Sequence, residues 1–287
     1  MNWIILTLLA IIARATYSLG TRMLSRDIKV SPITQSFLLT LATGVLILLF
    51  NPFIGGLGFN GVGSNFLLLS TIVIASVGGN IIYFIGQKKL DVGMTQIAFS
   101  SILIWGGFLS VVFLKSNFSI TQSIGIVILL SAILLVQVKK DRITLHRSVL
   151  YIVMSAMLFA LFQVGSAKIA PTISTGAYLI VTSFGTAITI LIIYFKTIKT
   201  DFSKLTSQVK NTFSKTLFAS GTSALYMIFA FMAYKKAPDS GVVVVLLTSQ
   251  VIVSVIFGII FLKERENMGI KLLAGILAVI AGILIKS

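Results

Sequence analysis

The 287-residue chain contains no cysteine and a single histidine, His146. Without cysteine there is no disulfide, no thiolate metal site and no cysteine nucleophile. A metal site held by two histidines is excluded as well, because the chain has only one. We therefore predict no cofactor and no metal, and we look for function in binding rather than in cysteine or metal chemistry.

Charged residues are also scarce, at 10% of the chain, whereas 57% of the residues are apolar. A water-soluble domain averages about 25% charged residues, so this chain lacks the charge to solvate a globular surface. The mean hydropathy of +1.06 agrees. The composition predicts an all-α, polytopic integral membrane protein that is embedded in lipid.

The few charges are strongly biased toward one sign, with 23 Lys and Arg against 7 Asp and Glu, for a net charge of +16. In a soluble protein this balance would suggest nucleic acid. Here the basic residues lie between apolar runs, where they fix topology and meet anionic lipid headgroups. The partners we expect are the lipid bilayer with its anionic headgroups and a small-molecule substrate, and no nucleic acid.

Long apolar runs are abundant. A helix needs about 20 mostly apolar residues to cross the hydrocarbon, and its backbone must be hydrogen-bonded internally. The connections between the runs are too short for a soluble catalytic domain. We predict ten transmembrane helices over residues 3–20, 31–50, 66–87, 92–114, 119–137, 148–168, 174–195, 216–235, 240–262 and 268–285.

The longest connection, 196–215, has apolar residues at steps of three and four: Ile198, Phe202, Leu205, Val209 and Phe213. Lysines fill the other faces of this pattern. Such amphipathicity predicts a short helix that lies on an anionic leaflet. A solvated charged linker is the alternative.

The chain repeats itself at an offset of 145 to 150 residues. Phe-Leu-Lys ends an apolar run at both 113–115 and 261–263, and a lysine pair precedes each copy, at 88–89 and at 235–236. Gly20 corresponds to Gly165 at an offset of 145. The ordered series predicts two five-helix repeats, residues 1–140 and 141–287, in a single integrated transmembrane domain. Because five is odd, the two repeats must be inverted, which is the usual construction of secondary transporters.

The last 50 residues carry a family resemblance. The exit Phe261-Leu262-Lys263-Glu264 and the pair Gly275 and Gly282, within ten spans arranged as five plus five, resemble the EamA family of the drug/metabolite transporter superfamily. The resemblance implies transport of small metabolites, often amino acids or sugars, across the inner membrane of a prokaryote. Proton exchange through a carboxylate within a span is disfavoured, because every acidic residue lies at or near a predicted connection.

The basic residues predict an orientation. They concentrate in the odd-numbered connections, which the positive-inside rule places in the cytoplasm. Both termini are then extracytoplasmic, although the members of the superfamily usually have both inside. We base the predicted orientation on the distribution of Lys and Arg in this chain.

Arg14 is the exception among the charges, because it lies about eleven residues into the first predicted helix. An arginine at a helix centre costs on the order of 2.5–3.5 kcal/mol on insertion scales and usually faces a cavity. We predict that Arg14 pairs with an anionic group of the substrate. The alternative is that its long side chain reaches toward the headgroups or bonds to helix carbonyls.

Other polar and aromatic residues within the spans predict a central polar cavity with aromatic walls. The full set of predicted substrate-binding residues is Arg14, Tyr17, Asn80, Tyr83, Gln96, Ser100, Trp105, Gln163, Tyr226, Ser249 and Gln250. We predict a secondary transporter of an amino acid or a similar small polar metabolite that works by alternating access. A flippase or an auxiliary subunit for a lipid-linked sugar is the alternative, and an enzyme is disfavoured because the spans contain no catalytic base.

Overall fold

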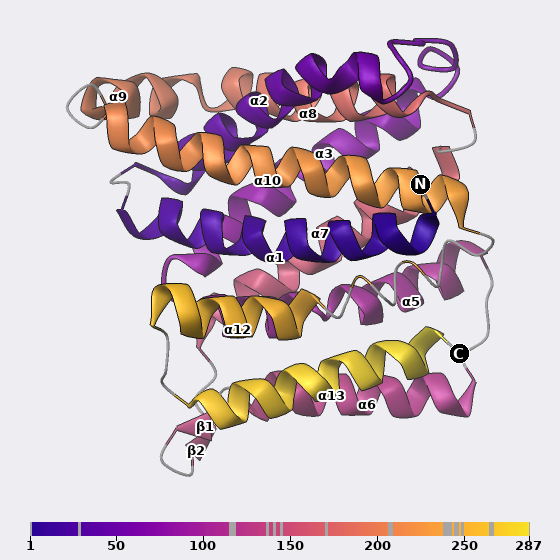
Figure 1. The fold of residues 1–287 in the computed structure, drawn as a ribbon, viewed down its shortest axis with the longest axis vertical. Helices are drawn as coiled ribbons and strands as arrows, with labels where there is room; N and C mark the ends of the chain where they lie inside the picture. The colour runs from indigo at the N-terminus through magenta and orange to yellow at the C-terminus, as the bar shows by residue number, and fades with distance from the viewer. Residues whose placement is uncertain are drawn as a thin grey trace.

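Helices that run side by side make up most of the molecule (Figure 1). The computed structural model describes residues 2–27, 30–114, 119–135, 138–139, 142–143, 146–169, 172–205, 209–237, 243, 247, 250–263 and 267–286. Lys115 of the first Phe-Leu-Lys copy and the segment 264–266 lie outside these residues. The described helices are α1 (Trp3–Asp27), α2 (Pro32–Phe50), η1 (Asn51–Phe53), α3 (Phe66–Gln87), α4 (Val92–Phe99), α5 (Ile102–Leu114), α6 (Ile120–Leu135), α7 (Arg147–Ile169), α8 (Thr175–Ile193), α9 (Phe195–Leu205), α10 (Val209–Lys236), α12 (Gln250–Leu262) and α13 (Met268–Lys286).

Two short strands, β1 (Val138–Lys139) and β2 (Arg142–Ile143), pair antiparallel between α6 and α7. They lie at the opposite end of the molecule from both chain termini (Figure 1). We call the end with β1, β2 and α9 the hairpin end. The end with the two termini is called the terminal end.

Six of the helices are long and apolar enough to cross a membrane by length and composition: α1, α2, α3, α7, α8 and α10. Four shorter apolar helical segments follow the order of the remaining predicted spans: Val92–Gly106, Ile120–Leu135, Val253–Leu262 and Met268–Leu284. The helical fold class is therefore confirmed, whereas the arrangement as ten crossings stays a prediction.

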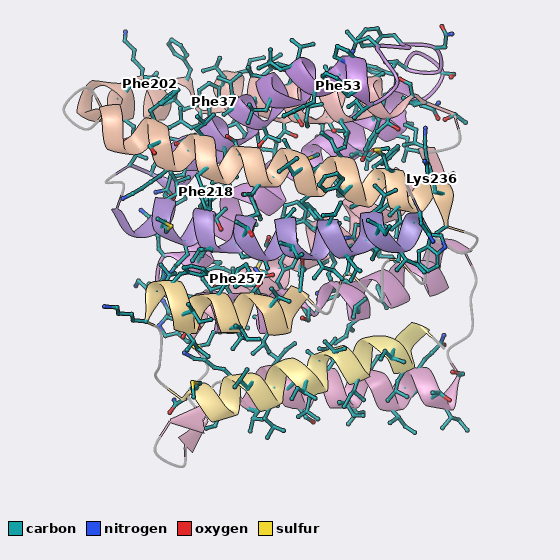
Figure 2. The ribbon with its side chains drawn as sticks, in the orientation of Figure 1. Phe37, Phe53, Phe202, Phe218, Lys236 and Phe257 are labelled. Atoms are coloured by element: carbon teal, nitrogen blue, oxygen red, sulfur yellow. The ribbon has the colours of Figure 1, made fainter. Side chains whose placement is uncertain are left out.

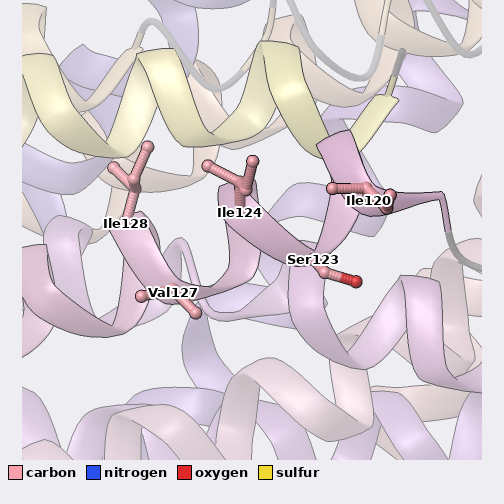
Figure 3. A pocket seen from close by; sticks show the side chains of 5 residues that line it. All are labelled: Ile120, Ser123, Ile124, Val127 and Ile128. Atoms are coloured by element: carbon pink, nitrogen blue, oxygen red, sulfur yellow. The ribbon is translucent and has the colours of Figure 1, made fainter.

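The outer surface of α6 illustrates why the chain needs lipid. Ile120, Ile124, Val127, Leu130 and Leu134 recur every three or four residues and are 42–83% exposed. The opposite side of α6 is buried and packs against α13. Figure 3 shows a shallow hollow on this helix, where Ile128 and the half-exposed Ile124 at the edge of the stripe point toward α13 and Val127 points away. An exposed apolar stripe of this length is stable only against hydrocarbon.

Several helices begin where the sequence supplies a capping side chain. Ser31 Oγ accepts a hydrogen bond from Thr34 N (3.2 Å), and Pro32 follows as the first residue of α2. Asp91 Oδ1 accepts from Met94 N (2.8 Å) at the start of α4. A side-chain oxygen at this position satisfies one of the free N–H groups of the first turn, and proline there loses no hydrogen bond. Both predicted spans therefore begin within one residue of their predicted starts.

The helices pack in recurring pairs. The most extensive contacts are those of α1 with α10 and of α3 with α7, followed by those of α6 with α13 and of α2 with α8. In Figure 1, α1 and α10 lie side by side along their whole length, and α13 and α6 form one edge of the molecule. Helices from the two halves of the sequence are thus interleaved.

The predicted span 92–114 is not one continuous helix, which corrects the sequence prediction. It divides into α4 and α5 at Ser100 and Ser101. The Ser100 hydroxyl donates to Gln96 O (3.0 Å), and the backbone N–H groups of both serines bond tightly to the preceding turn. Serine side chains compete for backbone carbonyls in this way, and the competition favours local bending of a helix. The break lies in the middle of the apolar run.

The predicted amphipathic helix 196–215 is also divided. Residues Phe195–Leu205 form α9, whereas the stretch from Val209 onward belongs to α10, seven residues before the predicted start of that span. Ile198 and Asp201 of α9 are buried, and Lys196 and Lys199 are exposed. The contact of α9 with α2 covers the buried side of α9.

Two kinds of contact join α9 to α2 at the hairpin end. Asp201 Oδ2 accepts hydrogen bonds from Ser31 N (2.9 Å) and from Thr34 Oγ1 (2.8 Å). The rings of Phe37 and Phe202 meet edge to face at 6.4 Å (Figure 2). The helix is therefore anchored on the bundle. Its contact with an anionic leaflet stays a prediction.

Candidate functional site

A cavity of about 650 Å³ lies among α1, α2, α3, α4, α5, α7, α8 and α10. Its volume falls in the range of small-molecule sites, about 300–1,000 Å³. Hydroxyl and amide side chains come mainly from α2, α3 and α8. They are Thr40, Thr43, Ser76, Asn80, Thr182, Ser183 and Thr186. Aromatic side chains come mainly from α1, α4, α7 and α10, so the cavity has one hydroxyl-rich wall and one aromatic wall.

Arg14 lies in the aromatic wall, surrounded by three rings. Its guanidinium carbon lies 4.9 Å from the ring centroid of Tyr17, 5.2 Å from that of Phe99 and 4.9 Å from that of Tyr226. A guanidinium over an aromatic face is attracted by the ring quadrupole, more strongly where water is excluded. The three rings come from α1, α4 and α10, so they hold the charge at the point where these helices meet.

The helix break between α4 and α5 helps to form this environment. Phe99 is the last residue of α4, directly before the break, and it contacts the rings of both Tyr83 (5.7 Å) and Phe159 (5.6 Å) edge to face. Interrupted helices at the middle of a membrane bundle often line binding sites, because their irregular backbone needs a cavity or protein partners. The break therefore connects the backbone of the fourth predicted span to the surroundings of Arg14.

The structure brings five of the predicted site residues to the cavity surface: Arg14, Tyr17, Asn80, Gln163 and Tyr226. The amide nitrogen of Asn80 donates to Ser76 O (2.8 Å) and to Ser76 Oγ (3.2 Å). Asn80 is thus held in place by its own helix. For all five residues, binding of a substrate stays a prediction.

Other predicted residues lie beside the cavity or away from it. Gln96 Nε2 donates to Tyr83 Oη (3.1 Å) and the Ser100 hydroxyl donates to Gln96 O, so these three form a buried polar cluster behind Phe99. Trp105 packs edge to face against Phe108 at 6.5 Å. Gln250 begins α12 and does not line the cavity. Ser249 lies outside the described residues.

The sequence prediction missed a group at the terminal end of the cavity. Lys235, which the sequence interpretation used only as part of the lysine pair in the repeat, lines the cavity, and its Nζ donates to Ile173 O (3.2 Å) and lies 5.4 Å from the ring centroid of Phe231. Phe231 stacks on Tyr178 at 5.0 Å with an interplanar angle of 16°. Tyr178 also contacts Ser166 through their hydroxyl groups. The sequence contained one indication that Lys235 could reach the cavity. It directly follows Tyr234, in the same apolar run as the predicted site residue Tyr226.

Among the described residues, the lining of the cavity reaches the terminal end but not the hairpin end. Its lining reaches Tyr178 and Lys235, within three residues of the helix ends at the terminal end. At the hairpin end, the lining stops at least seven residues, about two helical turns, short of every helix end. The cavity is therefore closer to the terminal end.

Polar contacts close the hairpin end between α1 and α3. Arg22 is 8% exposed, and its Nη1 donates to Gln87 O (2.6 Å) and Lys88 O (3.2 Å). Gln87 Nε2 donates to Thr21 Oγ1 (3.0 Å), and Lys88 Nζ donates to Val30 O (3.3 Å). Hydrogen bonds from a charged donor contribute about 1.5–3 kcal/mol each where water is excluded.

Residues 1–138 match the EamA-like transporter family. The match confirms the resemblance predicted from the sequence, and the family is one of membrane transporters. Together with the apolar helices, the match fits an integral membrane protein.

Comparison with solved structures gives 26 matching chains. One is a crystal structure described only as that of a protein, and it is similar with a TM-score of 0.63 and 13% sequence identity, covering 98% of this chain and 94% of that chain. At this identity the likeness concerns the fold alone. The comparison with curated proteins found no match.

Proposed function

We propose that this EamA-like protein is a secondary transporter that moves a small polar metabolite across the cytoplasmic membrane by alternating access. The observation that carries the proposal is the position of Arg14, a charged residue in the wall of a cavity in the middle of a lipid-embedded bundle. A buried charge in a membrane is costly and is retained where it lines a pathway or binds a ligand. We propose that Arg14 binds an anionic group of the substrate.

The proposed architecture is ten crossings in two inverted five-helix repeats, residues 1–140 and 141–287. The helix pairs support it. In the proposed repeat α1 corresponds to α7 and α3 corresponds to α10, so exchanging the halves turns the α1–α10 pair into the α7–α3 pair. These two pairs have the most extensive contacts. The same exchange maps α2 with α8 and α6 with α13 onto themselves. Equivalent neighbours across a pseudo-two-fold axis are what an inverted repeat requires.

Two corresponding glycines support the same repeat. Gly20 of α1 lies against Ala219 of α10, and Gly165 of α7 lies against Ile72 of α3. The glycines are 145 residues apart, and the residues they face are 147 apart. Small residues allow close helix approach in membranes. A glycine that permits close helix contact thus occurs at the corresponding interface of each half.

The asymmetry of the cavity supports alternating access. In the predicted orientation, the terminal end is extracytoplasmic, so the cavity lies toward the outside and the Arg22 contacts close the cytoplasmic side. Transport then requires a second state in which these contacts separate and the terminal end closes. Alternation between two such states moves a bound solute without an open channel.

A counterflow experiment tests the proposal. Purified protein is reconstituted into liposomes loaded with unlabelled solutes, and uptake of the labelled solute is measured for amino acids, sugars, nucleosides and organic acids. We expect counterflow for at least one anionic or zwitterionic solute, and a loss of at least about tenfold in apparent affinity with Arg14→Gln. Lys168→Gln is the matched control, because Lys168 is exposed at the terminal end and does not line the cavity.

Two outcomes would contradict the proposal. Counterflow with unchanged apparent affinity in Arg14→Gln would remove Arg14 from the binding site. If no small solute exchanges but a labelled lipid-linked sugar changes leaflets in the same liposomes, the flippase function replaces the transporter function.

A further inference from the structure

We infer that the cavity selects a small organic carboxylate with a flat apolar body, and that it discriminates against zwitterions and cations. This inference rests on the proposed function, because it names the substrate class of the same cavity. It narrows the prediction made from sequence, which included amino acids. Three features of the cavity carry it: its charge, the surroundings of Arg14 and the arrangement of the aromatic rings.

The charged residues that line the cavity are both positive. Arg14 lies in the middle of the cavity and Lys235 at its terminal end, and no aspartate or glutamate occurs among the described lining residues. Asp91 and Asp201 are engaged elsewhere: Asp91 Oδ2 lies 2.6 Å from Lys271 Nζ, and Asp201 accepts hydrogen bonds at the start of α2. An ammonium group in this cavity would meet these two cations, and none of the described lining residues would offer it a carboxylate. A carboxylate would meet two groups of opposite sign.

The guanidinium of Arg14 still has hydrogen-bonding capacity. Aromatic rings interact with guanidinium faces, whereas the five N–H donors lie in the guanidinium plane. Among the described residues, Arg14 Nε has no hydrogen-bond partner although it is buried, and neither has the buried hydroxyl oxygen of Thr43 in the opposite wall. A carboxylate accepts two parallel N–H bonds from a guanidinium, the geometry that suits Arg14 best.

The rings define the shape of the rest of the ligand. Phe99, Phe159 and Phe162 follow one another edge to face, at centroid distances of 5.6 and 6.2 Å, starting beside Arg14. The stacked pair of Tyr178 and Phe231 continues the aromatic surface toward Lys235. Such a surface gains most from a flat apolar body, which packs against ring faces and edges. The cavity volume of about 650 Å³ accommodates a ligand of this kind.

A matched series of three compounds tests the inference, because they share one phenyl ring and differ in charge. 3-Phenylpropionate is an anion, phenylalanine is a zwitterion and phenethylamine is a cation at neutral pH. Binding to the purified full-length protein in detergent is measured by ligand-induced thermal stabilisation over a concentration series. We expect 3-phenylpropionate to bind at least about tenfold more tightly than phenylalanine, and phenethylamine to give no saturable stabilisation.

Substitutions test whether 3-phenylpropionate binds at Arg14. Arg14→Gln is expected to weaken 3-phenylpropionate binding at least about tenfold, and Arg14→Lys less, since lysine keeps the charge without the planar fork. Lys168→Gln is expected to leave the affinity unchanged. The selectivity series on the unaltered protein needs no variant, so the inference stays testable even if Arg14→Gln does not fold.

The inference is overturned if phenylalanine or phenethylamine binds as tightly as 3-phenylpropionate, or if none of the three binds. The proposed function fails in a different way. If 3-phenylpropionate binds in an Arg14-dependent manner but no counterflow of it or of any other small solute occurs in liposomes, the carboxylate site stands and transport does not.

Discussion

Gly20 of α1 and Ala219 of α10 lie in direct contact, so that a Cβ atom on Gly20 would be only 3.0 Å from the Cα atom of Ala219. The contact brings two backbones together at the longest helix pair of the molecule, next to the cavity wall. Gly165 has the corresponding place in α7, where a Cβ atom would be 2.8 Å from Ile72 Cγ1 of α3. Close approach without side chains is how helices gain packing energy in lipid, where the hydrophobic effect between them is absent.

Gly20→Ala is therefore expected to destabilise the protein by about 1–3 kcal/mol, because the backbone of α10 must move away. Gly269→Ala in α13 is the matched control, since no atom of the described residues lies within 4 Å of a Cβ built there. In that exposed position alanine is expected to be neutral or stabilising by up to about 1 kcal/mol. Thermal unfolding in detergent measures both. Equal effects of the two substitutions would contradict the close contact.

The ion pair of Lys271 with Asp91 joins α13 to the start of α4 at a separation of 2.6 Å, with side-chain exposures of 6% and 18%. Removing one partner of a buried pair leaves an uncompensated charge, at a cost of about 3–5 kcal/mol. We expect Asp91→Asn to lower the midpoint of thermal unfolding strongly, although asparagine can still cap α4. The double variant Asp91→Asn with Lys271→Met is expected to recover most of the loss. A double variant less stable than Asp91→Asn would show that the pair is not the cause.

Arg22→Gln is expected to open the hairpin end more often, because the substitution removes the charged donor to Gln87 O and Lys88 O. A loss of about 1.5–3 kcal/mol would shift the balance of states about tenfold or more. The chain has no cysteine, so Ser223→Cys in the cavity wall gives a single labelling site. Its labelling by a thiol reagent added from the hairpin side should rise. Arg147→Gln, an exposed arginine at the same end, should leave the rate unchanged.

Orientation in the membrane follows from where the basic residues gather. We predict the hairpin end in the cytoplasm and the terminal end outside. Ser64→Cys at the terminal end is expected to react with an impermeant thiol reagent in intact cells, whereas Lys199→Cys on α9 is expected to react only after permeabilisation. Both positions are exposed. The reverse pattern would invert the protein in the membrane and make the cavity face the cytoplasm.

The ring of Tyr226, 4.9 Å from the guanidinium carbon of Arg14, gives a further prediction. Tyr226→Phe keeps the aromatic face and is expected to leave 3-phenylpropionate binding within about twofold of the unaltered protein. Tyr226→Leu removes the ring quadrupole and is expected to weaken binding by about fivefold or more, a loss of about 1 kcal/mol. Thermal stabilisation by the ligand measures both. Equal losses would indicate that the hydroxyl group, not the ring, is the important part.

Much of the helical layout was predictable because it depends on local chemistry. The third span, 66–87, coincides with α3, and Ser31 with Pro32 and Asp91 mark the starts of two helices through their own capping atoms. The break at Ser100 was not predicted, since two serines alone do not end an apolar run that continues on both sides of them. The break is stabilised by hydrogen bonds that compete with the regular helix pattern, and the contacts around Phe99 favour the broken helix over a continuous one.

The candidate site was predictable only in part. Arg14 could be singled out because a charge within an apolar run is costly wherever the helix packs. Its partners could not, because Phe99 and Tyr226 come from helices that lie about 85 and 212 positions away along the chain. Lys235 was likewise indistinguishable from a lysine that anchors a helix end at the headgroups.

The sequence by itself determined that this is a helical membrane protein with an isolated arginine in its first span, since the length and polarity of each segment are local properties. Only the tertiary structure decided which faces of the helices meet. The spans are apolar both where they contact lipid and where they contact protein, so hydrophobic periodicity does not encode their rotation. Packing between distant helices placed three rings around Arg14, brought Lys235 to the cavity and gathered polar residues from several helices in one cavity wall.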